Sequence, residues 1–190
     1  MTPGFISTPE PAATAYEHRV RSVLQSLGIS PESLGSRSLL ICEEASELVA
    51  VEIDVRGKPH QLVPAAAAAW REMKAAASAT GIALHIASAF RSVDRQAEII
   101  RSKLRAGLPL ERILAVNAPP GYSEHHTGRA VDVTTPGTKA LEEEFEATAA
   151  FRWLAENGSS FGYFLSYPRH NKQGYSYEPW HWCHRLALAP

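Results

Sequence analysis

The side chains best suited to chemistry lie in two runs in the last third of the sequence. The first run, Ser123–Asp132, reads SEHHTGRAVD and contains His125 and Asp132. Zinc takes imidazole nitrogen and carboxylate oxygen at about 2.0–2.2 Å, so both side chains would have to converge on one point. Seven residues of straight strand would separate them by about 23 Å and aim them at opposite faces. A shared metal therefore requires a bend, which Thr127-Gly128 could supply because glycine tolerates strained backbone. The alternative is a loop histidine and a surface aspartate.

The second run, Glu178–His184, reads EPWHWCH. A hydrolytic zinc site needs a third ligand and a nearby carboxylate to act as general base. His181 and Glu178 offer these two groups. Pro179 cannot donate to a strand ladder and biases the residue before it away from helix. We therefore expect Glu178 in the turn that leads into a final strand.

The alternation of side chains along that strand divides the second run into two faces. His181 and Cys183 share one face. Trp180 and Trp182 are expected to be largely buried on the opposite face, packed into the core. We expect the neighbouring strands to be Arg129–Thr134, which carries Asp132, and Ile82–Phe90, which leads into Arg91.

The two runs contain the patterns SxHxxGxAxD and ExWH, which resemble the zinc D-alanyl-D-alanine carboxypeptidases of the VanY type. That group is shared with D,D-dipeptidases, phage L-alanyl-D-glutamate endopeptidases and the Hedgehog signalling domain. A third segment, Ser88–Gln96, reads SAFRSVDRQ and is similar to the S-x-[YF]-R-S-x-x-x-Q segment of the family. The resemblance covers residues 82–184, and the first eighty residues carry no motif.

The resemblance implies one zinc ion per chain, held by His125, Asp132 and His181 with water in the fourth position. It also implies that Glu178 is the general base and later the proton donor. Arg91 would bind the scissile carbonyl or its oxyanion, where a fixed guanidinium stabilises developing charge. Gln96 and Ser123, together with Arg91, match family positions for substrate contact.

Several alternatives stay open at this stage. His126 is adjacent to His125 and is expected to face away from the metal. Cys183 could bind zinc as a thiolate, although Asp132 occupies the ligand position of the family. A disulfide between Cys42 and Cys183 would require an exported protein. The family often has an Arg-Tyr pair where this chain has Cys183-His184, so the resemblance does not extend to the shape of the neighbouring pocket.

The resemblance points to an enzyme that removes the terminal D-Ala from peptidoglycan stem peptides. The alternatives are a D,D-dipeptidase, a lysin-like endopeptidase of the L-alanyl-D-glutamate type, and a zinc-stabilised binding domain without catalysis. The presence of both Glu178 and Arg91 argues against the last, because a structural zinc site needs neither.

Composition limits the other function classes. The 190 residues contain 19 Lys and Arg against 20 Asp and Glu, a net charge of -1, which argues against a nucleic-acid partner. No apolar run reaches the roughly 20 residues of a membrane span, so no integral membrane protein is expected. The substrate class suggests the cell envelope or periplasm, but the N-terminus has no secretory signal pattern, which leaves a cytoplasmic location open. We expect a monomer.

The elements that must position these residues indicate an α+β fold, with a small, mainly antiparallel sheet flanked by helices and the zinc site at one face of the sheet. We expect a flexible tail at 1–13 and a single peptidase domain at 14–190, of which 82–184 carries the motifs. Loops are predicted at Ser30–Ser38 and Asn117–Glu124. Helices are predicted at Tyr16–Leu27, Pro64–Thr80, from the cap Ser92 to Ala106, briefly at Leu110–Val116, and at Lys139–Asn157. Strands are predicted at Leu48–Ile53, His60–Val63, Ile82–Phe90, Arg129–Thr134, Phe161–Tyr167 and Tyr177–His184.

Overall fold

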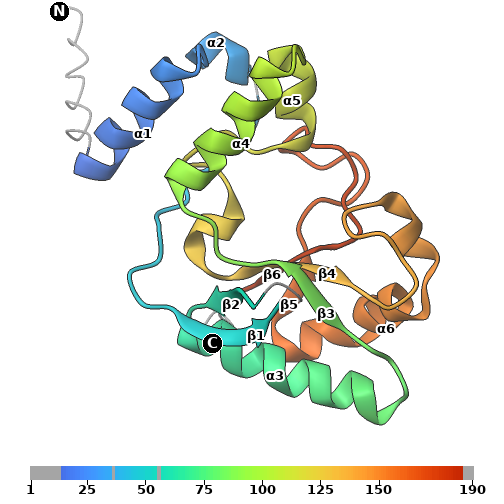
Figure 1. Cartoon of the computed structure of the whole chain (residues 1–190). Coiled ribbons are helices and arrows are strands. Elements are labelled where there is room, and N and C mark those ends of the chain that lie inside the picture. The colour runs from blue at the N-terminus through green and yellow to red at the C-terminus, as the bar shows by residue number, and fades with distance from the viewer. Residues whose placement is uncertain (1–13, 36, 55–56, 186–190) are drawn as a thin grey trace, which may run out of the picture.

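The computed structural model describes residues 14–35, 37–54 and 57–185, and the tail expected at 1–13 lies outside the described residues. Helices and antiparallel strands are mixed, which confirms the α+β prediction (Figure 1). The α-helices are α1 (Ala15–Ser26), α2 (Pro31–Leu34), α3 (Pro64–Ala79), α4 (Val93–Arg105), α5 (Leu110–Val116) and α6 (Ala149–Asn157). Short 3-10 helices are η1 (Glu124–Thr127), η2 (Glu143–Ala147) and η3 (Gly158–Phe161). The strands are β1 (Val49–Ile53), β2 (Pro59–Leu62), β3 (His85–Ser88), β4 (Ala130–Thr134), β5 (Tyr163–Leu165) and β6 (His181–His184).

The strands form two antiparallel sheets. Strands β1 and β2 form the predicted hairpin, in which Val49 lies opposite Leu62. The other four strands are ordered β3-β4-β6-β5. Strand β6 therefore lies between β4 and β5, and β3 pairs with β4 alone. The expectation that β3 would neighbour the last strand was wrong, because β4 lies between the two.

The main hydrophobic core lies between the strands and the alanine-rich helix α3. Proline at its first position and the small alanine side chains suit a helix that packs closely. Its buried residues recur at helical spacing and present one face to the core: Ala66, Ala67, Trp70, Met73 and Ala77. From the four-stranded sheet, Val131, Val133 and Trp182 join this core. Because side chains alternate along a strand, Asp132 and His181 point to the opposite face, where the site forms.

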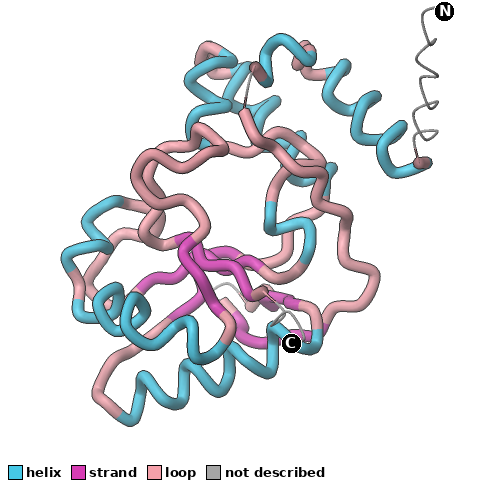
Figure 2. The backbone as a smooth tube through the Cα atoms, turned by 180° about the vertical axis from the view of Figure 1, so that it is seen from behind, coloured by secondary structure: helices cyan, strands magenta, loops and turns pink. Residues whose placement is uncertain are grey.

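A second hydrophobic cluster joins α1, α4 and α5 at the other end of the molecule (Figure 1). Val20 and Leu24 of α1 pack there against Ile100 of α4 and Ile113 of α5. Seen from behind, the strands lie beside α3, with long loop segments between them and these upper helices (Figure 2). None of the described helices is long and apolar enough to cross a membrane.

Two segments differ from the sequence-based expectation. The loop predicted at Ser30–Ser38 contains the one-turn helix α2, because Ser30 and Ser33 form a reciprocal capping box. The long helix predicted at Lys139–Asn157 is divided into η2 and α6. Thr148 has extended backbone between them, and its side chain accepts the Phe151 N–H as the cap of α6.

Three of the predicted strands begin later in the chain than expected. Strands β3, β5 and β6 are shorter than the predicted segments. Trp182 is buried as predicted, but Trp180 is half-buried and lines the same cavity as His181. Trp180 packs against the core as predicted, but it is not largely buried on the face opposite His181. The reason is that β6 begins at His181, so strand alternation does not extend back to residue 180.

Candidate metal centre and active-site pocket

The register of β4 and β6 brings two of the expected ligands together. Asp132 and His181 are directly opposite each other in the ladder. Directly opposite residues point to the same face of a sheet, so their side chains meet. The Nδ1 atom of His181 lies 3.0 Å from Oδ1 of Asp132. Both residues are buried, with about 3% of each exposed.

His125 reaches this point from the 3-10 helix η1, which ends in the predicted bend. Gly128 takes a left-handed conformation with φ of 64°. A Cβ atom there would lie 2.9 Å from Cδ2 of Leu48, so both the backbone and the space favour glycine. The bend turns His125 back onto β4 and places its Nε2 atom 3.1 Å from Oδ2 of Asp132. The imidazole rings of His125 and His181 stand nearly perpendicular, at 88°.

The three residues fit a zinc ion. One ligand atom from each of His125, Asp132 and His181 lies within 4.8 Å of the others. Ligands about 2.0–2.2 Å from a tetrahedral ion are about 3.4 Å apart, so small movements would close this set around zinc. Two imidazoles and a carboxylate form a borderline donor set that suits zinc, and three protein ligands leave a position open for water or substrate.

The charges at the site favour a cation. Burial would lower the pKa of His181, but its hydrogen bonds to Asp132 and Glu124 and their negative charges raise it to about 10. Burial would likewise raise the pKa of Asp132, and the two histidines instead hold it well below its usual range. A proton on His181 thus balances two carboxylates, and a metal ion could take over that role.

Glu124 is a carboxylate at the site that the sequence patterns did not assign. Its Oε2 atom accepts a hydrogen bond from Nε2 of His181 at 3.0 Å. Burial would raise the pKa of Glu124, but this bond and the charge of His181 lower it to about 2. Metal-binding histidines commonly donate their second N–H to such a carboxylate, which fixes the ring and its tautomer. The available signal was its position beside His125, although nothing local shows that it meets a residue 57 positions later.

Glu178 lies in the turn before β6, as predicted. The N–H of His181 donates to the Glu178 carbonyl oxygen at 3.1 Å, and this turn points the carboxylate back toward the ligands. Its Oε2 atom lies 3.9 Å from Nδ1 of His181. Burial is the main reason that the pKa of Glu178 is raised to about 7. A carboxylate with that pKa can both accept and return a proton near neutral pH.

Arg91 enters the site from the segment between β3 and α4. Its Nη1 donates to Oε1 of Gln96 at 2.8 Å, and its Nη2 donates to Oγ of Ser88 at 3.0 Å. Nη2 also lies 3.7 Å from Oδ2 of Asp132. These contacts hold the guanidinium at one edge of the metal centre. Gln96 itself is fully buried behind Arg91 and donates to the Ala118 carbonyl oxygen.

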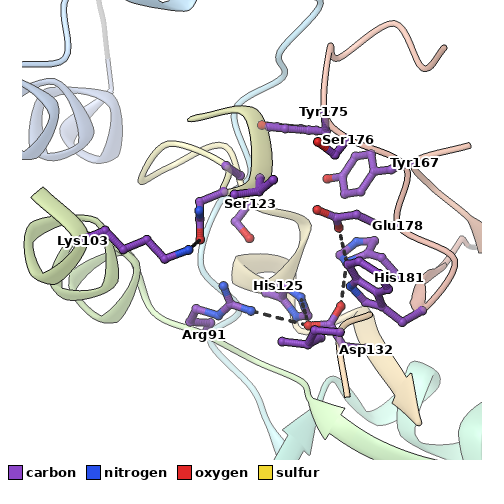
Figure 3. Close-up of a pocket in the computed structure, with 15 residues that line it drawn as sticks. Arg91, Lys103, Ser123, His125, Asp132, Tyr167, Tyr175, Ser176, Glu178 and His181 are labelled. Carbon is purple, nitrogen blue, oxygen red and sulfur yellow. Dashed lines mark hydrogen bonds and ion pairs between the residues drawn. The ribbon is translucent and has the colours of Figure 1, made fainter. Parts of the chain in front are cut away.

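The His–Asp–His group, Glu178 and Arg91 line one cavity of about 300 Å³ (Figure 3). Ser123 lies on its wall, where the family pattern places a substrate contact. Gln96 is absent from the described lining, so its contact with substrate stays a prediction. The remaining wall residues, which the sequence patterns did not identify, are Lys103, Val116, Asn117, Ala118, Leu141, Tyr167, Tyr175, Ser176 and Trp180.

The residues considered as alternative metal ligands, His126 and Cys183, lie outside the His125–Asp132–His181 group. His126 is buried, and its ring nitrogens contact the Gly121 N–H and the Arg91 carbonyl oxygen. Cys183 is a buried free thiol outside the His–Asp–His group, and burial raises its pKa. Cys42 is also free, so the two cysteines form no disulfide in this structure.

A buried His–Asp–His group that could hold a metal ion, with a carboxylate and a fixed arginine beside it on an α+β scaffold, is an arrangement typical of metal-dependent peptidases. Residues 59–186 match the family model described as "VanY: D-alanyl-D-alanine carboxypeptidase". The chain therefore belongs to the VanY family of D-alanyl-D-alanine carboxypeptidases, as its motifs suggested.

Individual relatives agree with the family. A D-alanyl-D-alanine carboxypeptidase of Enterococcus faecalis is 34% identical over 120 residues, which cover 56% of this chain and 42% of the relative. The solved LD-carboxypeptidase LdcB is 32% identical with a TM-score of 0.64, and the match covers 74% of this chain and 69% of LdcB. A point mutant of the vancomycin-resistance D,D-pentapeptidase VanY, solved in complex with Zn(II), is 29% identical with a TM-score of 0.57, covering 73% and 78%. The chain spans less than half the length of the curated relatives that it matches first.

Proposed function

We propose that this chain is a zinc carboxypeptidase that releases the terminal D-Ala from peptidoglycan stem peptides. The observation that carries the proposal is the placement of Glu178 and Arg91 on either side of the His125–Asp132–His181 group in one cavity. Family membership and the zinc complex of a structural neighbour support the same conclusion. We propose one ion per chain at this group. When bound, zinc would polarise the scissile carbonyl and lower the pKa of a bound water.

The protein side chains have separate tasks in this reaction. Glu178 accepts the proton of the attacking water, and its raised pKa lets it return that proton to the leaving amine. Arg91 donates to the oxygen that becomes negatively charged as the carbonyl is attacked. Because Gln96 and Ser88 already fix the guanidinium, little reorganisation accompanies that step. Ser123 contacts the peptide in this proposal, which its position on the cavity wall supports.

The neighbours favour two versions of this activity. A D,D-carboxypeptidase acts on a pentapeptide stem that ends in D-Ala-D-Ala, and the family description supports this version first. An LD-carboxypeptidase removes D-Ala that follows an L-centre, and the similarity to LdcB supports this version second. Both release one D-Ala from a free C-terminus, so the same groups serve either bond.

Mass spectrometry of synthetic stem peptides incubated with the zinc-loaded protein tests the proposal. We expect loss of one alanine from the pentapeptide. Loss from the tetrapeptide alone would assign the L,D activity instead. Hydrolysis of the free dipeptide D-Ala-D-Ala, added as a further substrate, would indicate a dipeptidase, and an internal cut in the stem peptide would indicate an endopeptidase. If zinc-loaded protein cleaved none of these peptides, the hydrolase proposal would be wrong and a binding domain would be favoured.

A further inference from the structure

Lys103 is a basic side chain of the cavity wall with no role in the steps above. It belongs to α4 and extends into the cavity from the side opposite His181 and Glu178 (Figure 3). Its Nζ atom donates to Oδ1 of Asn117 at 3.1 Å. Asn117 is held in turn, because its Nδ2 donates to the Ile113 carbonyl oxygen at 2.9 Å. The neutral amide of Asn117 therefore orients the Lys103 ammonium but does not neutralise its positive charge.

The charge of Lys103 has no ion-pair partner in the part of the chain that the structure describes. Burial lowers the pKa of Lys103, and the nearby positive charge of Arg91 lowers it further. The negative charge of an anionic ligand near Lys103 would offset both effects, since opposite charge favours the protonated amine.

Arg91 is poorly placed to bind a second anion. Its two terminal nitrogens already donate to Gln96 and Ser88, and one of them faces Asp132. Lys103 is the other Lys or Arg of the described cavity wall. An amine on a flexible stem retains donors for a ligand after its single contact with Asn117.

The size of the cavity indicates which anionic group of a peptide substrate would reach Lys103. One extended residue spans about 3.3–3.6 Å, so the carboxylate of a terminal residue lies about that far beyond the scissile carbonyl. A cavity of about 300 Å³ that also contains the metal-binding group is small enough for one residue to bridge the two sides. Carboxylates farther back in a stem peptide would lie on the other side of the scissile bond.

We infer that Lys103 binds the free C-terminal carboxylate of the substrate, with Asn117 as its positioning residue. This inference rests on the proposed function, because it assigns the end of the peptide to the side of the cavity beyond Arg91. It explains how the site distinguishes a chain end from an internal bond. The substrate class is a peptide with an unblocked C-terminus.

The test measures binding, so that it does not depend on turnover. Glu178→Gln protein loaded with zinc is titrated calorimetrically with a stem pentapeptide and with the same peptide amidated only at its C-terminus. The titrations are repeated with Lys103→Met and Lys103→Arg in the same background. Arg101→Met, an exposed change on the same helix, is the matched control.

We expect the free acid to bind about 10–100-fold more tightly than the amide, as a charged hydrogen bond in a partly buried site would give. Lys103→Met should reduce acid binding to the level of the amide and leave amide binding unchanged. Lys103→Arg should restore part of the difference, and Arg101→Met should keep all of it. Equal affinities for acid and amide, an equal loss on both peptides in Lys103→Met, or no binding of either peptide would overturn the inference. Absence of D-Ala release by the unmodified protein would instead contradict the proposed function.

Discussion

The imidazole ring of His126 is hydrogen-bonded to the backbone of Arg91. Its Nδ1 lies 2.5 Å from the Arg91 carbonyl oxygen, and its Nε2 accepts the Gly121 N–H at 3.1 Å. This pattern requires the neutral tautomer with the proton on Nδ1. The Arg91 N–H also donates to the His125 carbonyl oxygen at 3.2 Å. Both backbone polar groups of Arg91 are therefore hydrogen-bonded to the His125–His126 pair. His126 thus supports the site without facing the metal position.

This bonding predicts a pH-dependent stability. Burial lowers the pKa of His126 to about 4, against 6.5 for the unfolded chain. Its contribution is complete above pH 6.5 and is lost as the pH falls from about 6.5 to about 4, because only the unfolded chain takes up the proton there. At about 1.4 kcal/mol per pKa unit, the effect is on the order of 3 kcal/mol. Urea unfolding of zinc-free protein should show a shallower pH slope in His126→Asn than in the wild type. Equal slopes would contradict the depressed pKa.

Zinc content should depend on the three proposed ligands. His125→Ala or His181→Ala removes one of three protein donors, so we expect most of the metal to be lost at equilibrium. Cys183→Ser and His184→Ala are the controls and should keep about one zinc per chain. Metal analysis after dialysis measures the result. Full zinc in either histidine variant would require a different ligand set.

Glu124→Ala should weaken zinc binding without removing a ligand. Loss of the carboxylate frees the His181 ring, and such outer partners are typically worth about 10–100-fold in metal affinity. Competition with a chelator measures the change. Glu124→Gln retains an oxygen acceptor and should lose less, and the exposed Glu43→Ala should lose nothing. Wild-type affinity in Glu124→Ala would show that the hydrogen bond does not position His181 for metal.

Glu178→Gln should separate catalysis from metal binding. The change keeps the size of the side chain and leaves the three ligands in place, so zinc should stay near one per chain. The rate of D-Ala release should fall by about 10²–10⁴-fold because the proton acceptor is gone. In the wild type the rate should fall as the pH drops below the pKa of Glu178, since the base must be deprotonated. Near-normal activity of Glu178→Gln on every stem peptide would assign the base elsewhere.

Arg91 and Gln96 should differ in their kinetic effects. Arg91→Lys keeps the charge but loses the planar fork, and we expect a loss of about 10²–10³-fold in kcat if Arg91 stabilises the oxyanion. Gln96→Leu removes the acceptor that holds Nη1, so a positioning role lowers kcat with little change in KM. A raised KM with unchanged kcat would instead identify Gln96 as a substrate contact.

Much of the site could be predicted because its signals are local. The bend at Gly128 and the turn that places Glu178 depend on residues within a few positions of each other, and both are present in the structure. The hairpin and the alanine-rich helix follow from side-chain alternation and spacing in the same way. The prediction of one helix at Lys139–Asn157 failed because Thr148 interrupts it as the cap of α6. A helix that restarts after a cap has nearly the same spacing of apolar residues as a continuous helix.

The amino-acid sequence by itself determined which chemical groups this protein possesses and their family pattern. Only the tertiary structure decided which other residues meet them. The pairing of Asp132 with His181 depends on strand register, and the contact of Glu124 with His181 depends on the fold of η1 against β6. Lys103 lines the cavity because α4, packed with α1 and α5 in the second hydrophobic cluster, directs this side chain toward the site. Such contacts join residues far apart in the chain, and their energies come from packing and burial that no short stretch of sequence contains.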